Sequence, residues 1–262
     1  MTSALPMTFP GRTVKIGSPD GETVRRIQRR LNEMGCGPVA EDGRFDDDTE
    51  QAVQLFQVRS VDALGIPLVA DGRVGPLTWG ALFGAASLPA VTAPPGSFAA
   101  KLLEVASAEV GVMESPAGSN RGPRVDQYVR SVGLDPTGGF AWCAAFVYFC
   151  FEKACAELGA PNRVVKTAGV QDHWQKAGQT GIPRIPHAEF TDDPSRVQPG
   201  HVFVIGFPKG LGHTGLVEAI SGGRLITIEG NTNQDGSRNG VGVFRRDKRK
   251  TSDINLGFIS YI

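Results

Sequence analysis

The 262-residue sequence has neither an excess of charge nor a long apolar run, and both absences narrow what the protein can do. Lysine and arginine together number 27, as do aspartate and glutamate, so the formal net charge is zero. Such a balance gives no indication of a nucleic-acid partner or of an anionic membrane surface. No segment approaches the roughly 20 apolar residues that a membrane-spanning helix needs, so we expect no membrane insertion.

The start of the chain lacks a positively charged stretch followed by an apolar core. It therefore does not match a secretory signal peptide, and we assign residues 1–12 to an N-terminal tail. We expect a protein that is synthesised without a signal peptide and reaches its place of action after release from the cell or through another export route.

Cysteine is scarce, and none of the four residues forms the C-x-x-C pair typical of zinc sites and redox centres. Nothing else in the sequence indicates a metal or a cofactor, so we predict neither. Cys36, Cys150 and Cys155 are interpreted as small buried apolar residues. Cys143 differs because it stands after Trp142 at the beginning of an apolar helical run. The unpaired N–H groups and partial positive charge of a helix start favour a thiolate there.

The stretch 87–98 is rich in proline and small residues, which predicts an extended linker between two domains. In the segment before it, residues 13–86, apolar residues recur at three- and four-residue steps, as in an amphipathic helix. Asp48 or Thr49 is expected to cap a second helix. We therefore predict that the first domain is a small all-α bundle.

A short pattern occurs twice in this first segment. Asp42–Phe45 and Asp71–Val74 both have Asp-Gly-Arg followed by an apolar residue, and the two copies are 29 residues apart (71 − 42). In each copy a threonine, Thr49 or Thr78, stands seven positions after the aspartate. Each copy predicts a tight turn that leads into a helix, so the bundle is expected to have internal pseudo-symmetry.

Residues 15–84 resemble the three-helix peptidoglycan-binding domain found in many cell-wall hydrolases. The resemblance is carried by both Asp-Gly-Arg turns and by the apolar helix positions that flank them. The chain departs from the family at Asp46, where glycine is usual. The resemblance implies a three-helix fold and peptidoglycan as the partner; the alternative is a generic three-helix spacer.

Residues 99–262 change from helical to strand periodicity. Helices are predicted at 98–110 and 140–158, and strands at 202–205, 214–220, 225–229, 241–245 and 257–262. Ser221–Arg224 is predicted to be a hairpin turn, and the basic run 245–250 a solvated loop. Helices followed by antiparallel strands predict an α+β domain.

The predicted hairpin brings together groups that suit nucleophilic catalysis. Side chains alternate along a strand, so His213 is expected to face Glu229 and Asn231 of the next strand. One imidazole nitrogen can then be held by the carboxylate or the amide, while the other acts on the thiol of Cys143. Glycines 212, 215 and 230 are expected to leave space for a substrate backbone.

Several of these residues have simpler interpretations. Glu229 alone could be a surface carboxylate at a strand end, and Asn231 alone a turn residue. Trp142 either lines a cleft or packs in the core. The three other histidines are interpreted as structural or exposed: His173, His187 and His201.

The segments 142–147, 199–200, 212–215 and 228–231 resemble the CHAP family, the cysteine- and histidine-dependent amidohydrolases/peptidases. The resemblance covers about residues 99–262. It implies a papain-like fold, cleavage of amide bonds in peptidoglycan, and catalytic roles for Cys143, His213, Glu229 and Asn231. The chain departs at His201, where aspartate is common. A calcium site is not carried over, because the loop 119–126 lacks dense carboxylates.

Together the two resemblances predict a monomeric peptidoglycan hydrolase that cuts an amide bond in the stem peptide or at the muramoyl–alanine link. It would act on the cell wall or in the periplasm, as a phage lysin or an exported effector. One alternative is a non-catalytic wall-binding or structural protein with a degenerate papain-like domain. Another is a cysteine peptidase that acts on proteins.

Overall fold

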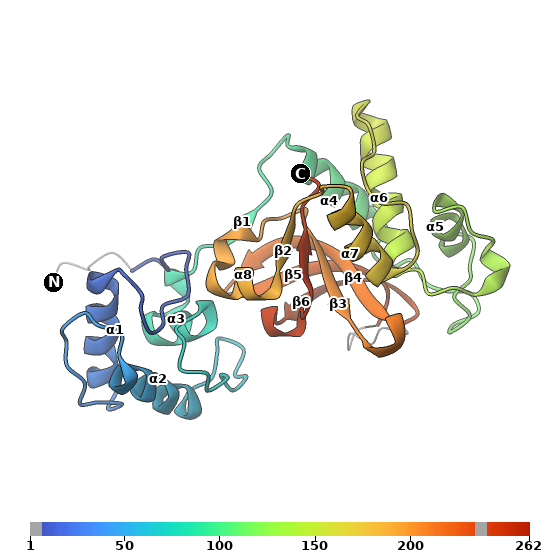
Figure 1. The fold of residues 1–262 in the computed structure, drawn as a ribbon. Coiled ribbons are helices and arrows are strands. Elements are labelled where there is room, and N and C mark those ends of the chain that lie inside the picture. Colours follow the sequence, from blue (N-terminus) through green and yellow to red (C-terminus); the bar gives the residue numbers. More distant parts are fainter. Residues whose placement is uncertain (1–6, 234–239) are drawn as a thin grey trace. The chain divides into compact units, whose positions relative to one another are not determined.

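The structure is a computed structural model of the chain, and it describes residues 7–233 and 240–262 (Figure 1). Residues 1–6 of the predicted tail lie outside the described residues. The chain divides into two compact units, with the main division between Ala90 and Val91; the segments 188–196 and 221–223 group with the first unit.

The N-terminal part of the first unit contains three α-helices, as predicted: α1 (Gly21–Glu33), α2 (Asp47–Arg59) and α3 (Pro76–Phe83). Their apolar faces meet in one core that is built around Trp79, Phe56 and Leu31, all of them fully or almost fully buried. Proline occupies the first turn of α3, where its missing N–H has no intrahelical partner to lose.

The predicted cap of α2 was wrong. The N-cap is Asp46, whose carboxylate accepts hydrogen bonds from the backbone N–H of Thr49 at 3.0 Å and from its hydroxyl at 2.8 Å. The side chain of Thr49 points inward and is 1% exposed, because it also contacts Gln28. The replacement of the family's usual glycine by Asp46 therefore adds a good capping residue.

The internal repeat is built around two buried glutamines. The amide nitrogen of Gln28 lies 3.1 Å from Asp42 Oδ1 and 2.9 Å from the carbonyl oxygen of Arg44, while its amide oxygen accepts from the N–H of Gly43 at 2.9 Å. Gln57 makes the same contacts with the second turn, at 2.8, 3.0 and 2.9 Å. Each glutamine thus fixes one Asp-Gly-Arg turn against the helix that precedes it.

The second unit is an α+β domain with an antiparallel sheet, as predicted. Its helices are α4 (Phe98–Ala108), α5 (Val125–Ser131), α6 (Cys143–Leu158) and α7 (Val170–Gln179), whereas α8 (His187–Asp192) falls almost entirely in the segment 188–196 of the first unit. Its strands are β1 (Val91–Thr92), β2 (Arg184–Pro186), β3 (Val202–Gly206), β4 (Gly212–Ser221), β5 (Arg224–Thr232), β6 (Gly242–Arg249) and β7 (Gly257–Ile259). The strand order is β2-β7-β3-β4-β5-β6, with β1 paired to β4.

Helix α6 is the central helix of this unit. It contacts α4, α5 and α7 as well as β5, and Figure 1 shows it beside the orange and red strands of the sheet. Its buried side chains share one core with those of the sheet, including Phe146, Val204 and Ile228. The apolar run 140–158 therefore forms a helix packed on a sheet, as predicted from the sequence.

Two sequence interpretations change in the structure. The strand β1 lies inside the stretch predicted as a linker, where Val91 pairs with Ile220 and Thr92 with Ala219. The basic run 245–250, predicted to be a solvated loop, instead forms most of β6. The hairpin turn was predicted correctly: Gly222 and Gly223 have φ of 55° and 77°, which suit the tight two-residue connection between β4 and β5.

Candidate active site

Cys143 is the first residue of α6, and its side chain is 3% exposed. The preceding residue, Trp142, is the N-cap and provides no side-chain hydrogen bond to the helix. The N–H groups of the first turn are therefore not capped by a side chain, and they direct partial positive charge toward the thiol. The predicted nucleophile thus lies at a helix start, as the sequence indicated.

His213 is the second residue of β4, and its ring is 2% exposed. Its Nε2 donates a hydrogen bond to Oε2 of Glu229 at 2.8 Å. Its Nδ1 has no oxygen or nitrogen partner among the described residues, which leaves this atom for the thiol of Cys143 that interacts with the ring. Burial lowers the pKa of His213, but Cys143 and Glu229 together raise it from 6.5 to about 9. The ring is therefore a cation at neutral pH.

Glu229 lies on β5 and is fully buried, and each of its two carboxylate oxygens accepts two hydrogen bonds. Oε1 accepts from the hydroxyl of Thr227 at 2.6 Å and from Nε of Arg249 at 3.0 Å. Oε2 accepts from His213 and from Nη2 of Arg249, the latter at 2.6 Å. Burial raises the pKa of Glu229, but the hydrogen bond and charge of His213, with those of Arg249, lower it to about 2. The carboxylate stays ionised over the whole neutral range.

Arg249 was not predicted to belong to the site. It is the last residue of β6 and is 7% exposed, in a run that the sequence analysis assigned to solvent. Its guanidinium also lies over the ring of Phe203, with 5.2 Å between Cζ and the ring centroid. No periodicity in the sequence distinguishes Arg249 from the exposed arginine Arg245 on the same strand.

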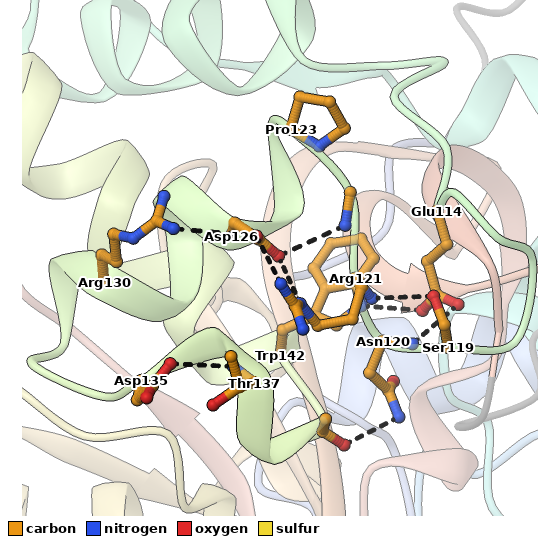
Figure 2. A network of polar contacts seen from close by, with 12 residues as sticks. Glu114, Ser119, Asn120, Arg121, Pro123, Asp126, Arg130, Asp135, Thr137 and Trp142 are labelled. Carbon is orange, nitrogen blue, oxygen red and sulfur yellow. Dashed lines mark hydrogen bonds and ion pairs between the residues drawn. The ribbon is translucent and has the colours of Figure 1, made fainter.

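Asn231 lies near the end of β5, is fully buried and has a positive φ of 54°. Its Nδ2 donates to Oδ1 of Asn120 at 2.7 Å, a residue that the sequence analysis did not single out. Asn120 in turn donates from Nδ2 to the carbonyl oxygen of Gly139 at 3.1 Å and from its backbone N–H to Oε2 of Glu114 at 3.1 Å (Figure 2). The asparagine pair therefore connects the end of β5 with the segment that leads into α6.

Trp142 completes this connection. Its indole N–H donates to Oε1 of Glu114 at 2.9 Å, as Figure 2 shows. The ring is fully buried and lies on Tyr128, with 5.4 Å between ring centroids. Of the two roles considered for Trp142, packing is therefore correct, and the contacts of the indole hold this residue in place directly before Cys143.

The expectation that three glycines leave space for a substrate was wrong. A Cβ on Gly230 would lie 2.7 Å from Phe146 and 2.8 Å from Trp142, so this glycine lets α6 approach β5 closely. A Cβ on Gly215 would lie 3.0 Å from Cγ of Glu229. On Gly212 it would lie 2.6 Å from a backbone oxygen. The space beside these residues is filled by the protein itself.

The other three histidines have hydrogen-bond partners outside the group formed by Cys143, His213 and Glu229. Nε2 of His173 lies 2.8 Å from the hydroxyl of Tyr261, and Nδ1 of His201 accepts from the backbone N–H of Gln198 at 3.2 Å. Burial lowers the pKa of both His173 and His201 to about 4, so both rings are neutral at physiological pH. His187 donates from Nδ1 to a backbone carbonyl at 2.7 Å.

An ion pair joins the loop before α5 to the first turn of that helix. Nε and Nη2 of Arg121 lie 2.9 and 3.0 Å from the two carboxylate oxygens of Asp126 (Figure 2). Within residues 7–233 and 240–262, no group of three or more His, Cys, Asp and Glu side chains is arranged to hold a metal ion. No helix in the same described part of the chain has the length and apolar character required to cross a membrane.

The structure thus brings Cys143, His213 and Glu229 together, and connects Asn231 to the segment before α6 through Asn120. The catalytic roles of these four predicted residues remain predictions. Two residues of the cluster were missed: Arg249, for which the sequence holds no signal, and Asn120, which was considered only as part of a loop poor in carboxylates.

Comparison with known proteins identifies two families along the chain. Residues 20–82 match the model of the putative peptidoglycan binding domain, and residues 135–231 match the model of the CHAP domain. No curated protein and no solved structure matches the chain significantly. A CHAP domain is typically a cysteine amidase or peptidase, in keeping with the thiol and imidazole that this fold brings together. The chain therefore contains a CHAP domain, and a peptidoglycan-binding domain with three helices precedes it.

Proposed function

We propose that the protein hydrolyses an amide bond of peptidoglycan, in the stem peptide or at the muramoyl–alanine link, with Cys143 as nucleophile. The observation that carries this proposal is the buried imidazole of His213, which has one nitrogen on Glu229 and the other left for the thiol. A ring held in this way fits the activation of a nucleophile by a base that a third group orients.

The proposed reaction has two halves. The thiolate of Cys143 attacks the amide carbonyl carbon, and the backbone N–H of Cys143 donates to the oxyanion that forms. The imidazolium of His213 then gives its proton to the leaving amine as the carbon–nitrogen bond breaks, which produces a thioester. In the second half the neutral imidazole takes a proton from water, which attacks the thioester; the acid is released and Cys143 leaves as the thiolate, so that the thiolate–imidazolium pair is restored.

Glu229 holds the ring in this scheme, and Asn231 is a second polar support. The ionised carboxylate keeps the proton on Nε2 and stabilises the imidazolium, so that Nδ1 exchanges its proton with sulfur and with the substrate. The first domain would raise the local concentration of the enzyme at the insoluble polymer. Tethering of this kind increases the rate of encounter without a change in the catalytic groups.

The test is digestion of purified peptidoglycan with the full chain, followed by mass spectrometry of the new ends. A new N-terminal L-alanine would identify an amidase, and other new termini an endopeptidase. A Cys143→Ala protein that still cleaves wall peptides would overturn the proposal. Wall binding without cleavage by the intact chain would favour the alternative of a non-catalytic wall-binding protein, and preferential cleavage of soluble proteins would favour a general peptidase.

We further propose that the protein meets the wall as a lysin after release or as an exported effector in the periplasm. The support is the combination of a wall-binding domain with a hydrolase domain on one chain. Expression in a bacterial host with and without a pore-forming partner distinguishes the two routes, because only a released lysin needs the pore. Retention in intact cells with no wall phenotype under either condition would argue against both.

A further inference from the structure

Arg249 lies 18 residues beyond the end of the CHAP match (249 − 231), yet it makes two hydrogen bonds to the carboxylate that holds His213. Nε and Nη2 of the guanidinium each bond a different oxygen of Glu229. A bidentate contact of this kind fixes the orientation of the carboxylate as well as its charge, which a single contact does not.

A β-bulge brings Arg249 to this position. Between β5 and β6, Thr227 pairs with Arg246 and Leu225 with Arg249, so β6 has three residue steps where β5 has two. Regular alternation would place Arg249 on the face opposite to Arg246. The extra residue turns it back onto the face that carries Thr227 and Glu229, and bulges commonly redirect a side chain in this way beside active sites.

We propose that Arg249 is a positioning residue that acts through Glu229: it neutralises the buried carboxylate and fixes its orientation, so that the imidazolium of His213 remains able to give up its proton. The inference rests on the thiol–imidazole chemistry proposed above. In that state the thiolate of Cys143, the imidazolium, the carboxylate and the guanidinium alternate in sign, and their charges sum to zero.

The groups that face His213 define what the loss of Arg249 would do. Cys143 reaches the ring from α6 and Glu229 from β5, while Arg249 approaches Glu229 from β6. The uncharged ring of Phe203 on β3 lies against both His213 and Arg249. Without Arg249, only the imidazolium would balance Glu229, so His213 would hold its proton more tightly and become a weaker acid toward the leaving amine.

The experiment compares Arg249→Met and Arg249→Lys with the wild-type full chain. One readout is the pH dependence of Cys143 alkylation by iodoacetamide, located by peptide mass spectrometry; the other is kcat and KM on soluble peptidoglycan fragments. We expect Arg249→Met to lower kcat about tenfold to a hundredfold, the usual worth of a hydrogen bond to a charged group, with little change in KM. The inflection that reports loss of the His213 proton should move to higher pH.

Arg249→Lys should restore part of kcat and bring the pH of the inflection most of the way back to the wild-type value, because lysine keeps the charge but not the bidentate contact. The matched control is Arg245→Met, on the same strand, where the exposed guanidinium pairs with Glu218 at 2.7 Å; its inflection should match the wild type. A folded Arg249→Met protein with wild-type kcat and inflection would overturn the inference. If that variant does not fold, Arg249→Lys with lower stability but wild-type kcat would overturn it.

The alkylation readout separates this inference from the proposed function, since it needs no peptidoglycan. If Cys143 of the wild type reacts no faster than an ordinary thiol, the thiol–imidazole chemistry fails, and the inference about Arg249 fails with it. If Cys143 reacts rapidly and the Arg249 variants react in the same way, the proposed function stands and Arg249 is only structural.

Discussion

The two units of this chain each bury a polar network, and the networks differ in kind. In the helical unit, Gln28 and Gln57 are neutral, almost fully buried, and bonded to turn backbone through both amide atoms. In the CHAP unit, His213, Glu229 and Arg249 are charged, and one ring nitrogen is left without an oxygen or nitrogen partner among the described residues. A network in which every polar group has a hydrogen-bond partner stabilises a turn. A network that leaves a ring nitrogen available to a thiol can instead take part in a reaction.

The difference also explains why one network occurs twice and the other once. A turn-holding amide needs only its own helix and the loop that follows, so it is repeated wherever that unit is repeated. The charged cluster needs a helix start and three strands, namely α6, β4, β5 and β6. Breaking each network should therefore affect different properties of the same molecule.

The largest expected effect follows from removal of the proposed nucleophile. Cys143→Ala should lower peptidoglycan cleavage by about 10⁴-fold or more, as loss of a triad member does in other acyl-transfer enzymes, and leave the thermal midpoint nearly unchanged. The release of soluble fragments from insoluble peptidoglycan measures the rate of cleavage, and circular dichroism measures the thermal midpoint. The control is Cys155→Ala, a cysteine at the other end of α6 whose loss should affect stability and not rate. Equal losses of rate in both variants would contradict the assignment.

Substitutions in the neutral network should change the stability of the protein and leave the reactivity of Cys143 unchanged. Gln28→Ala or Gln57→Ala leaves buried backbone groups of one turn without partners, which should cost about 2–3 kcal/mol of unfolding free energy. Because the two glutamines make equivalent contacts, the two costs should be similar. Denaturant unfolding of the full chain measures them, and alkylation of Cys143 serves as the control readout. A change in the alkylation rate of the folded protein would show that the two networks are not independent of each other.

The features that could be predicted from the sequence are those that local chemistry sets. The Asp-Gly-Arg turns, the Gly222-Gly223 hairpin and the helix start at Cys143 all follow from short-range rules about turns and helix ends. The same repeat could also have identified the glutamines, since Gln28 and Gln57 stand 29 residues apart (57 − 28), the spacing of the turns that they hold.

Arg249 and the three glycines could not have been interpreted correctly from the sequence. Regular strand alternation would place Arg249 on the face of the sheet opposite to Glu229. The bulge that brings it to the same face is set by the pairing of β6 with β5, and the sequence of β6 does not indicate it. A glycine is compatible with open space and with close packing alike; Gly230 proves to be packed against Phe146 and Trp142, and only the position of α6 decides this.

The charged network should also respond to pH. The pKa of His213 is raised from 6.5 to about 9, so the imidazolium and its stabilising contacts are fully present below 6.5 and are lost as the pH rises through about 9. Cleavage, expressed as kcat/KM, should therefore fall about tenfold per pH unit above that value. His173 and His201 are already neutral there, since their pKa values are lowered to about 4. An inflection near 6.5 in the alkylation profile, or one that persists in His213→Gln, would contradict this assignment.

The smallest expected effect concerns Asn120, a neutral amide that lies beside the charged network. It joins Asn231 at 2.7 Å to Gly139 at 3.1 Å, and so connects β5 with the segment before α6. Asn120→Gly is the suitable variant, because φ at this position is 55°, a conformation that alanine would adopt only with strain. We expect kcat/KM to fall about threefold to tenfold, the loss that follows when one hydrogen bond of about 1 kcal/mol no longer restrains the geometry.

The comparison of the two networks decides how this variant should be interpreted. If Asn120 only holds a loop, as the glutamines do, Asn120→Gly will lower the thermal midpoint and leave the rate of the folded protein unchanged. If it sets the separation of β5 from the start of α6, the rate of Cys143 alkylation will fall even where the protein is fully folded. We expect the second result, because both elements joined by this amide carry residues of the candidate site, whereas each glutamine joins a helix to the turn that follows it.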